Sequence, residues 1–319
     1  MGQSKNGEIR SMKILVTGGA GYIGSTLVPE LLNAGHEVCV YDSLLFGGNS
    51  MFPHFKNKNF SMIVGDIRDT EKLKEVVIGK DVVIHLAAIV GYPACEKDHQ
   101  VTKDVNLKAT KALVDMLDEN QVILFGSTGS NYGKVEGVCT EESPLNPLSL
   151  YGETKTEAEQ YIMSNSKAVA YRFATAFGLS PRLRLDLLVN DFTTKAIRDK
   201  YIVVYESHFM RTFIHVYDIA RSFMFALENL DKMIGNVYNV GSDKMNHSKK
   251  EVCEKIQNVT PYFLHLADIG EDADKRDYVV SYDKISALGF ETTIDLDSGV
   301  RELVNGITIA KFDNHYSNV

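Results

Sequence analysis

A glycine-rich turn near the start of the chain constrains the fold more than any other feature. The apolar run 13–17 leads directly into Thr17-Gly18-Gly19-Ala20-Gly21-Tyr22-Ile23-Gly24, and a helical pattern then continues to Ala34. The glycines at 18, 21 and 24 permit a tight turn, close approach of a pyrophosphate, and close packing of helix on strand. The helix N-terminus adds free N–H groups and a positive dipole end. This strand–turn–helix unit predicts a dinucleotide-binding domain.

Short apolar runs alternate with helical patterns over the first two-thirds of the chain. Such strands, apolar on both faces and separated by helices, predict a parallel sheet that is covered on both sides. Right-handed crossovers then give the doubly wound, Rossmann form of α/β fold. The strands are expected at 13–17, 37–42, 60–64, 82–85, 122–125 and 168–172, and the helices at 70–78, 101–119 and 149–164.

The alternating pattern ends after Phe173, where a smaller lobe is expected to begin. A helix at 186–199 and short strands at 201–205 and 212–216 fit a mixed α/β substrate lobe. A later helix at 217–230 and a strand at 237–240 can return to the first domain. We therefore predict a polar tail at 1–11, a dinucleotide-binding domain at 12–173 with returning segments at about 212–242, and a substrate lobe from 174–211 and 243–319.

Composition excludes several classes of partner and cofactor. The net charge is −8 without a basic cluster, which argues against binding to nucleic acid or to an anionic membrane. The chain has neither an apolar run long enough to span a bilayer nor the apolar stretch of a signal peptide, so a cytoplasmic location is expected. The four cysteines are scattered without a CxxC pair, which favours reduced thiols. The nine histidines lack metal-ligand spacing. We predict that no metal is bound.

Residues at the ends of the next strands complete a predicted cofactor site. Asp42 ends the second strand, where a carboxylate accepts hydrogen bonds from the adenosine ribose and repels a 2′-phosphate, which favours NAD over NADP. Asp66 and Ile67 follow the third strand and are expected at the adenine ring; alternatively, Asp66 caps the next helix. Leu86, Ala87 and Ala88 follow the fourth strand and allow the backbone to approach the cofactor. We expect the preceding His85 to be a buried core residue.

A tyrosine and a lysine four residues apart give the candidate chemistry. Tyr151 and Lys155 share one face of the helix that follows the fifth strand. An ammonium and a cationic nicotinamide nearby are expected to lower the tyrosine pKa from about 10. Tyr151 is then a general base for a hydroxyl whose carbon gives hydride to NAD, and Lys155 also holds the nicotinamide ribose. The alternative is a chance pair on a surface helix. Thr128 is the expected hydroxyl partner, with Ser127 and Ser130 as turn caps.

Taken in order, these motifs resemble the extended short-chain dehydrogenase/reductases, in particular the nucleotide-sugar epimerases and dehydratases of the UDP-galactose 4-epimerase type. The resemblance covers about residues 13–310 and includes Asn106, which it places at the cofactor site. It implies an NAD domain, a lobe that binds a nucleotide-diphosphate sugar, and a catalytic triad of Thr128, Tyr151 and Lys155. It also implies a homodimer formed by the helices 101–119 and 149–164.

The same resemblance implies substrate-binding residues. Arg211, in the run Arg-Thr-Phe-Ile-His-Val-Tyr-Asp, and Arg276 match arginines that contact the nucleotide diphosphate. Asn190 falls where these enzymes often place a substrate-binding asparagine. Thr175 replaces an asparagine that usually contacts the sugar. The pair 129–130 is Gly-Ser where 4,6-dehydratases have Asp-Glu, and this argues against elimination of water.

Segments 181–192 and 269–278 look most similar to a bacterial subgroup that includes the GDP-linked heptose C4 dehydrogenases of capsule polysaccharide biosynthesis. The expected function is NAD-dependent oxidation at C4 of a nucleotide sugar, by a C4 dehydrogenase or a 4-epimerase. Two alternatives stay open: a 4,6-dehydratase or reductase of the same family, and a non-catalytic NAD-binding sensor or scaffold.

Overall fold

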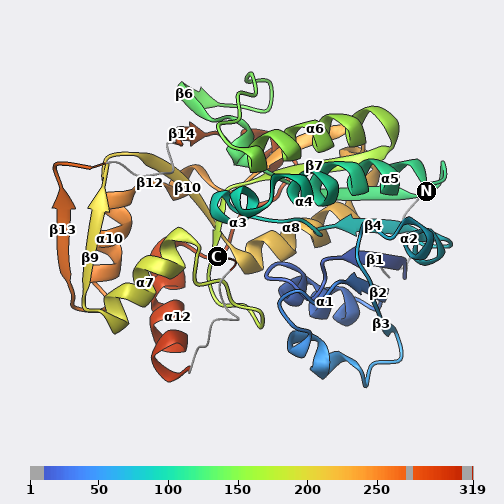
Figure 1. Ribbon diagram of the computed structural model, residues 1–319, viewed down its shortest axis with the longest axis horizontal. Coiled ribbons are helices and arrows are strands. Elements are labelled where there is room, and N and C mark those ends of the chain that lie inside the picture. The colour runs from blue at the N-terminus through green and yellow to red at the C-terminus, as the bar shows by residue number, and fades with distance from the viewer. Residues whose placement is uncertain (1–10, 271–275, 311–317, 319) are drawn as a thin grey trace.

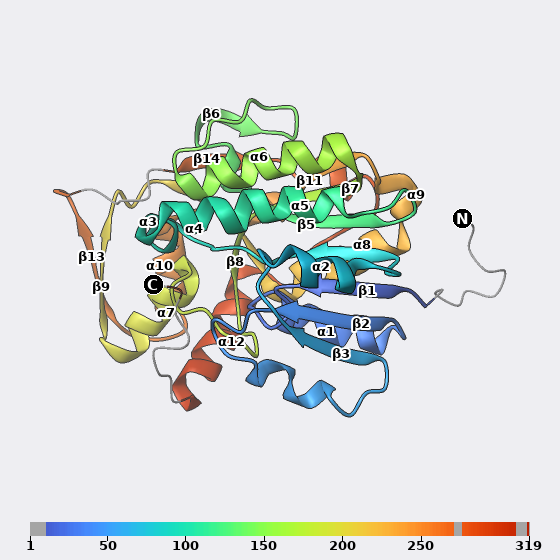
Figure 2. The same cartoon turned by 45° about the vertical axis from the view of Figure 1, so that its right-hand side comes forward.

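A computed structural model of the chain describes residues 11–270, 276–310 and 318. Apart from Ser11, the predicted polar tail lies outside these residues. Figures 1 and 2 show a large twisted sheet with helices on both faces and a smaller lobe beside it that contains α7, α10, α12 and the strand pair β9–β13.

The large sheet has seven strands in the order β11-β7-β5-β4-β1-β2-β3, and every neighbouring pair is parallel. The chain winds outward from β1 in one direction and then from β4 in the other, so the switch point lies between β1 and β4. The predicted doubly wound parallel sheet is confirmed. Its strands are β1 Lys13–Thr17, β2 Glu37–Asp42, β3 Phe60–Val64, β4 Val82–His85, β5 Val122–Thr128, β7 Lys167–Phe173 and β11 Asn236–Val240.

Two apolar cores cover the two faces of this sheet, and β1 contributes to both. Ile14 and Val16 belong to the core under α1 and α8, whereas Leu15 belongs to the core under α2, α5 and α6. This is the two-residue alternation of a strand buried on both faces. The helices here are α1 Gly24–Asn33, α2 Thr70–Val77, α3 Tyr92–Lys97, α4 His99–Lys103, α5 Ala109–Asp115, α6 Leu150–Asn165, α8 Val216–Glu228 and α9 Leu230–Met233, with 3-10 turns at Asn49–His54 and Gly129–Asn131.

The smaller lobe is mixed α/β. A three-stranded sheet has the order β12-β10-β8, a parallel pair joins β13 to β9, and a second parallel pair joins β14 to β6. A third core lies between β8, β9 and β10 and the helices α7, α10 and α12, whereas the buried residues of β6 and β14 belong to the core under α1 and α8. The elements are β6 Lys134–Cys139, β8 Thr175–Phe177, β9 Tyr201–Tyr205, β10 Met210–His215, β12 Asn246–Ser248, β13 Phe263–Ala267, β14 Asp277–Val280, α7 Leu188–Arg198, α10 Lys249–Gln257, α11 Asp283–Ser286, α12 Leu296–Ile309 and a 3-10 turn at Asp243–Met245.

The structure differs from the sequence-based expectations in two places. The helix expected at 101–119 is interrupted by a π turn, Asp104–Lys108, and α5 ends at Asp115. Residues 212–215 form part of β10, which pairs with β8 and β12 in the smaller lobe and not with the large sheet, and Val216 begins α8. The strand expected at 237–240 returns to the large sheet as β11, as predicted. The exact division into two domains stays a prediction.

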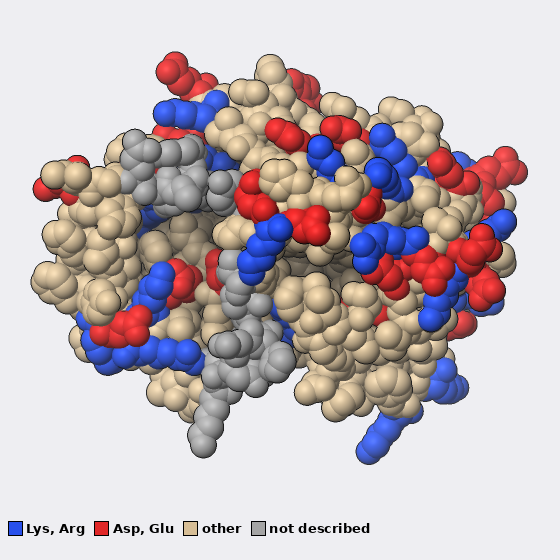
Figure 3. All heavy atoms as spheres, viewed as in Figure 1, with Lys and Arg blue, Asp and Glu red and all other residues tan. Residues whose placement is uncertain are grey.

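Four further findings concern the classes of protein weighed above. Within residues 11–270 and 276–310, no helix has both the length and the apolar character needed to cross a bilayer. The described residues contain no cluster of three or more candidate metal ligands. All four cysteines are buried free thiols. Figure 3 shows basic and acidic side chains intermixed on the face it displays.

Candidate active site

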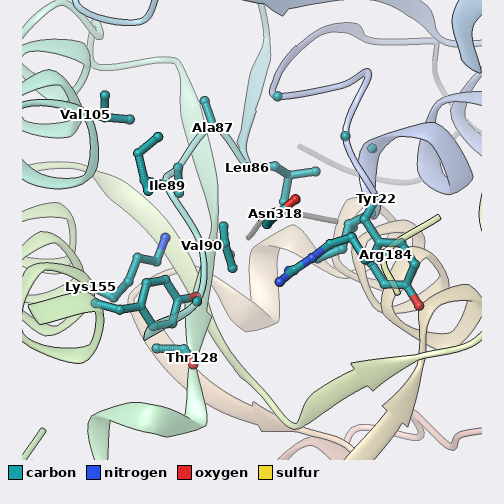
Figure 4. A pocket seen from close by; sticks show the side chains of 18 of the residues that line it. Tyr22, Leu86, Ala87, Ile89, Val90, Val105, Thr128, Lys155, Arg184 and Asn318 are labelled. Atoms are coloured by element: carbon teal, nitrogen blue, oxygen red, sulfur yellow. The ribbon is translucent and has the colours of Figure 1, made fainter. Parts of the chain in front are cut away.

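A cavity of about 940 Å³ lies at the carboxyl ends of β1, β2, β4 and β5, where the smaller lobe approaches the large sheet. Ligands of doubly wound folds bind at this edge. Figure 4 shows Lys155 and Thr128 on one side of the cavity and Tyr22 and Arg184 on the other. The segment after β4, which includes Leu86, Ala87, Ile89 and Val90, lies between them.

The glycine turn forms one wall of the cavity, and its glycines differ in what surrounds them. Gly18 has φ +72°, and an added Cβ would lie 2.7 Å from the Ala87 nitrogen. A Cβ on Gly24 would lie 2.5 Å from Gly19 Cα, so the helix start packs directly on the turn. By contrast, a Cβ on Gly21 would meet only the Gly18 oxygen, at 3.1 Å, and would project beside the cavity. The turn thus keeps backbone exposed where a pyrophosphate would bind.

The acid at the end of β2 is held by backbone groups. The Asp42 carboxylate accepts hydrogen bonds from the Ala20 and Leu44 nitrogens at 3.0 and 2.8 Å. Burial raises the pKa of Asp42, and these two bonds oppose that rise. The carboxylate faces the cavity with the glycine turn beside it, as an acceptor for the ribose hydroxyls of NAD must.

Arg182 brings a cation to the same place from the start of the smaller lobe. Its backbone nitrogen binds the Ser25 hydroxyl at the start of α1, and its guanidinium stacks 4.0 Å from the Phe46 ring centroid. Arg182 is 5% exposed, and its buried Nε has no hydrogen-bond partner among the described residues. A buried orphan donor beside a glycine turn fits a phosphate or ribose oxygen of a dinucleotide. The residues present therefore fit NAD.

Asp66 and Ile67 line the cavity beyond β3. Both Asp66 carboxylate oxygens bind the Arg68 guanidinium, at 2.9 and 2.7 Å, and this pairing lowers the pKa of Asp66. The alternative role of Asp66 as a helix cap is not what the structure shows, because Asp69 caps α2 by accepting from the Lys72 nitrogen.

The segment after β4 is fixed from behind. The Asn106 side chain accepts from the Ile89 nitrogen at 2.8 Å and donates to the Ile89 oxygen at 2.9 Å. Asn106 sits in the π turn, is 1% exposed, and is absent from the cavity lining. The structure therefore places it behind the segment that borders the cofactor.

His85 joins this arrangement to β1. Its Nδ1 lies 2.7 Å from the Thr17 hydroxyl and its Nε2 lies 2.9 Å from the Thr110 hydroxyl, which itself donates to the Asn106 oxygen. Because the Thr110 proton is committed, Nε2 carries the ring proton and Nδ1 accepts from Thr17. Burial, with the nearby Lys155 charge, lowers the pKa of His85 to about 3. The ring is thus a neutral, fully bonded core residue, as expected.

The three predicted catalytic side chains line the cavity together. Ser149 caps α6 by accepting from the Gly152 nitrogen, and this places Tyr151 and Lys155 on the first turns of that helix. Thr128 ends β5 and hydrogen-bonds the Tyr151 hydroxyl. The Thr128 hydroxyl also accepts from the Ser130 nitrogen at 3.1 Å, so its own proton is available to Tyr151. The Lys155 ammonium lies 3.9 Å from the Phe125 ring centroid, and the residue is 3% exposed.

The charge state of the pair differs from the sequence-based expectation. Burial raises the pKa of Tyr151, as does the nearby Cys95; the Thr128 hydrogen bond and the charges of Arg184 and Arg276 oppose the rise. Nearby charges alone favour a lowered Tyr151 pKa, but burial outweighs them. Burial also lowers the pKa of Lys155 to about 7, against the raising effect of Glu159. Near neutral pH the protonation state of Lys155 is therefore more sensitive to its surroundings than that of Tyr151.

Arginines and small polar groups form the end of the cavity nearest the smaller lobe. Arg276 donates to the Ser130 hydroxyl at 2.6 Å, and Thr175 lines the cavity at the start of β8. Arg184 lines it from the opposite side and forms an ion pair with Asp186. Two cations and a hydroxyl there suit an anionic, hydroxyl-rich ligand.

Two predicted substrate residues are not part of the lining. Asn190 is fully buried, and its amide binds backbone groups: it accepts from the Gly178 nitrogen at 3.0 Å and donates to the Arg184 oxygen at 2.8 Å. Arg211 is 1% exposed, and its guanidinium binds the Met210 oxygen at 3.0 Å. The structure brings neither side chain to the cavity, because α7 and β10 turn them toward the protein interior.

Sequence reasoning missed Arg182, Arg184 and Phe46, all of which line the cavity. A signal was available for the first two: arginines two residues apart in an otherwise apolar run, Pro-Arg-Leu-Arg-Leu, are unusual if no ligand or carboxylate faces them. Phe46 follows the β2 end and carries no comparable pattern.

The geometry agrees with comparisons to known proteins. Residues 14–241 match the model of the NAD dependent epimerase/dehydratase family. The low-salt glycan biosynthesis protein Agl12 of Haloferax volcanii is 29% identical over 92% of this chain and 98% of its own length. The UDP-glucuronic acid 4-epimerase of Bacillus cereus, solved with UDP-glucuronic acid and NAD, superposes with a TM-score of 0.84 at 27% identity, over 93% of this chain and 99% of the other.

The UDP-glucose 4-epimerase of Thermus thermophilus, solved with NAD, gives a TM-score of 0.81 at 26% identity over 94% of this chain and all of the other. These matches span both lobes, and the family match covers the glycine turn, Thr128, Tyr151 and Lys155. The chain is an enzyme with NAD as its cofactor, and it belongs to the NAD-dependent epimerase/dehydratase family.

Proposed function

We propose that this enzyme oxidises C4 of a nucleotide-diphosphate sugar with Tyr151 as the base. One observation carries the proposal: Thr128, Tyr151 and Lys155 line a single cavity whose opposite wall is the glycine turn. The residues that surround NAD and the residues that move a proton thus face one space. At the polar end of the cavity, Arg276 and Thr175 offer a cation and a hydroxyl to the sugar diphosphate.

In the proposed reaction Tyr151 acts as its phenolate, which the Lys155 ammonium and the positive charge of bound NAD would favour against the effect of burial. The phenolate takes the proton of the C4 hydroxyl, while Thr128 donates a hydrogen bond to the tyrosine oxygen. The C4–H bond breaks with both electrons, and the C4–O bond becomes a carbonyl. NAD, when bound, accepts the hydride. The Lys155 ammonium stabilises the phenolate and holds the nicotinamide ribose.

The position that 4,6-dehydratases use for an acidic pair supports oxidation without loss of water. An added Cβ on Gly129 would lie 3.2 Å from the Phe173 oxygen and 3.4 Å from the Tyr278 hydroxyl. A carboxylate side chain at this position would require the neighbouring backbone to shift. The chain therefore lacks the acid and base that elimination needs at this point.

Two outcomes share this first step. If the keto sugar leaves, the enzyme is a C4 dehydrogenase, and the similarity of segment 181–192 supports a GDP-heptose-like substrate in capsule polysaccharide biosynthesis. If the keto sugar rotates in the site and is reduced on its other face, the enzyme is a 4-epimerase. The names of the two solved neighbours support this outcome.

The test is anaerobic incubation of the purified protein with GDP-, UDP-, dTDP- and CDP-linked sugars, followed by absorbance at 340 nm and product NMR. Stoichiometric NADH with a 4-keto product identifies a C4 dehydrogenase. An inverted stereocentre without net NADH identifies a 4-epimerase. No spectral change and no product with any sugar supports the sensor or scaffold instead. Tyr151→Phe should lower kcat by about 10²–10⁴-fold; full turnover in this variant contradicts the role of Tyr151.

We further propose that the enzyme is a homodimer that pairs α5 and α6 with their copies. The two helices lie side by side on one face of the large sheet (Figure 2). The Tyr161 hydroxyl donates to Asp115 across them at 2.6 Å, so the pair presents one continuous surface. Light scattering after size-exclusion chromatography measures the mass, and a monomer at micromolar concentration contradicts this proposal.

A further inference from the structure

A buried carboxylate lies one helical turn beyond Lys155, and the proposed mechanism does not yet use it. Glu159 is 2% exposed and shares the inner face of α6 with Lys155, four residues before it. Its carboxylate accepts from Arg172 Nη2 at 2.7 Å and from Arg172 Nε at 3.1 Å. Arg172 comes from β7 and is 6% exposed, so this ion pair is fully inside the protein.

The second carboxylate oxygen reaches the end of β5. Glu159 Oε2 accepts from the Ser127 hydroxyl at 2.6 Å and from Asn131 Nδ2 at 3.2 Å, and Asn131 also donates to the Ser127 oxygen at 3.2 Å. Ser127 lines the cavity, but its proton is committed to Glu159. The adjacent Thr128 is left as the hydroxyl that bonds Tyr151.

The titratable and charged groups near Lys155 and Tyr151 come from four elements. On α6, Tyr151 and Glu159 lie one turn before and one turn after it. From β4, His85 is neutral, because burial and Lys155 lower its pKa to about 3. From α3, burial raises the pKa of Cys95 to about 11, so this thiol is also neutral. From β7, the Arg172 charge is engaged by Glu159. Burial works against the ammonium, and the Glu159 carboxylate works for it.

We propose that Glu159 is a positioning residue of the active site: its charge keeps Lys155 an ammonium, and its hydrogen bond to Ser127 fixes the end of β5 that carries Thr128. The inference rests on the proposed role of Lys155 in holding NAD. It assigns the buried Arg172 the task of holding the Glu159 carboxylate in place, through the hydrogen bonds from Nε and Nη2.

The test uses a charge-balanced variant, Glu159→Gln with Arg172→Gln, because Glu159→Gln alone leaves an uncompensated buried guanidinium and risks unfolding. The dissociation constant for NAD is measured by calorimetry from pH 6 to pH 9, without any sugar nucleotide. NAD affinity should fall as Lys155 loses its proton. In the double variant this fall should begin about one pH unit lower, which makes binding at pH 8 about tenfold weaker.

Three further variants are controls for the pH profile of NAD binding. Glu157→Gln removes an exposed carboxylate from the same helix and should leave the profile unchanged. Glu159→Asp keeps the charge and should keep the wild-type midpoint. Lys155→Met should abolish the pH-dependent fall. If the double variant is less stable but keeps the wild-type midpoint, Glu159 is only structural and the proposal is wrong; it is equally wrong if Lys155→Met retains the fall. Since no sugar is present, these results are independent of turnover and of the fate of Tyr151→Phe.

Discussion

The two walls of the cavity present different chemical groups to a ligand. The wall formed by the glycine turn and the end of β4 is closely packed backbone: an added Cβ at Gly18 or Gly24 would lie within 3 Å of neighbouring main-chain atoms. The wall formed by β5 and α6 presents ionisable side chains whose states depend on buried partners such as Glu159. The first wall is therefore sensitive to added atoms, whereas the second is sensitive to changes of charge. The following predictions test that contrast.

The largest effect is expected from one methyl group on the backbone wall. Gly18→Ala places a Cβ 2.7 Å from the Ala87 nitrogen at φ +72°, and NAD affinity should fall at least about 100-fold as the turn shifts. Gly35→Ala is the matched control, because Gly35 has φ +84° with nothing within 4 Å of an added Cβ. This control should lose only about 1 kcal/mol of stability and no NAD affinity. Equal losses of affinity in the two variants would remove the distinction between the walls.

A smaller effect should follow from the charge that reaches the backbone wall from the other lobe. Arg182→Met keeps an apolar contact with Phe46 but removes the buried guanidinium. The dissociation constant for NAD should rise about tenfold, the amount expected for one charged hydrogen bond. Arg182→Lys should retain part of the affinity. Calorimetry at two salt concentrations measures both variants, and unchanged binding by Arg182→Met would show that this arginine only joins the lobes.

The pH dependence of stability should depend on His85, behind the backbone wall. The folded pKa of about 3 lies below the ordinary value of 6.5, so the unfolded chain binds more protons between these values. Stability is therefore fully present above pH 6.5 and is lost as the pH falls toward 3, by up to ~1.4 kcal/mol per pH unit from this one group. Urea unfolding at pH 4.5, 5.5 and 6.5 should show a shallower slope for His85→Gln. An identical slope would mean that other groups control the loss of stability at acid pH.

The smallest effect on the reaction is expected from Asn190. Because its amide binds backbone rather than the cavity, Asn190→Ala should cost about 1–2 kcal/mol of stability and leave the KM for the sugar nucleotide within about twofold. Arg276→Met, which removes a cavity cation, should raise the same KM by about tenfold or more. If Asn190→Ala gives the larger rise in KM, the side chain reaches the substrate after all.

The parts of the molecule that were predictable are those that local sequence determines. The strand–turn–helix unit at 13–33, the positions of the parallel strands and the shared face of Tyr151 and Lys155 follow from spacing along one or two elements. Sequence position places Asn190 and Arg211 at the substrate, but the direction in which their side chains face is set by the tertiary packing that buries both. The π turn at 104–108 likewise depends on Thr110 and Asn106 finding buried partners.

The pKa values show the same limit. A pattern of residues records which charges are near each other, but not how far water is excluded from them. Charges alone predict a lowered Tyr151 pKa, yet burial dominates and raises it. For Glu159, the spacing from Lys155 is visible in the sequence, but its ion-pair partner Arg172 lies on another element and is not.

The position of β11 has a consequence for the order in which the chain folds. β7 and β11 are neighbours in the large sheet, with Val169 opposite Asn236, although most of the smaller lobe's first half lies between them in the sequence. A chain made from its N-terminus cannot close this edge until residue 240 has left the ribosome, and pairing then requires a long loop to close. We expect the last strand to join late, after β1 to β7 have assembled, so the edge of β7 is the part of the nascent protein most in need of protection from aggregation.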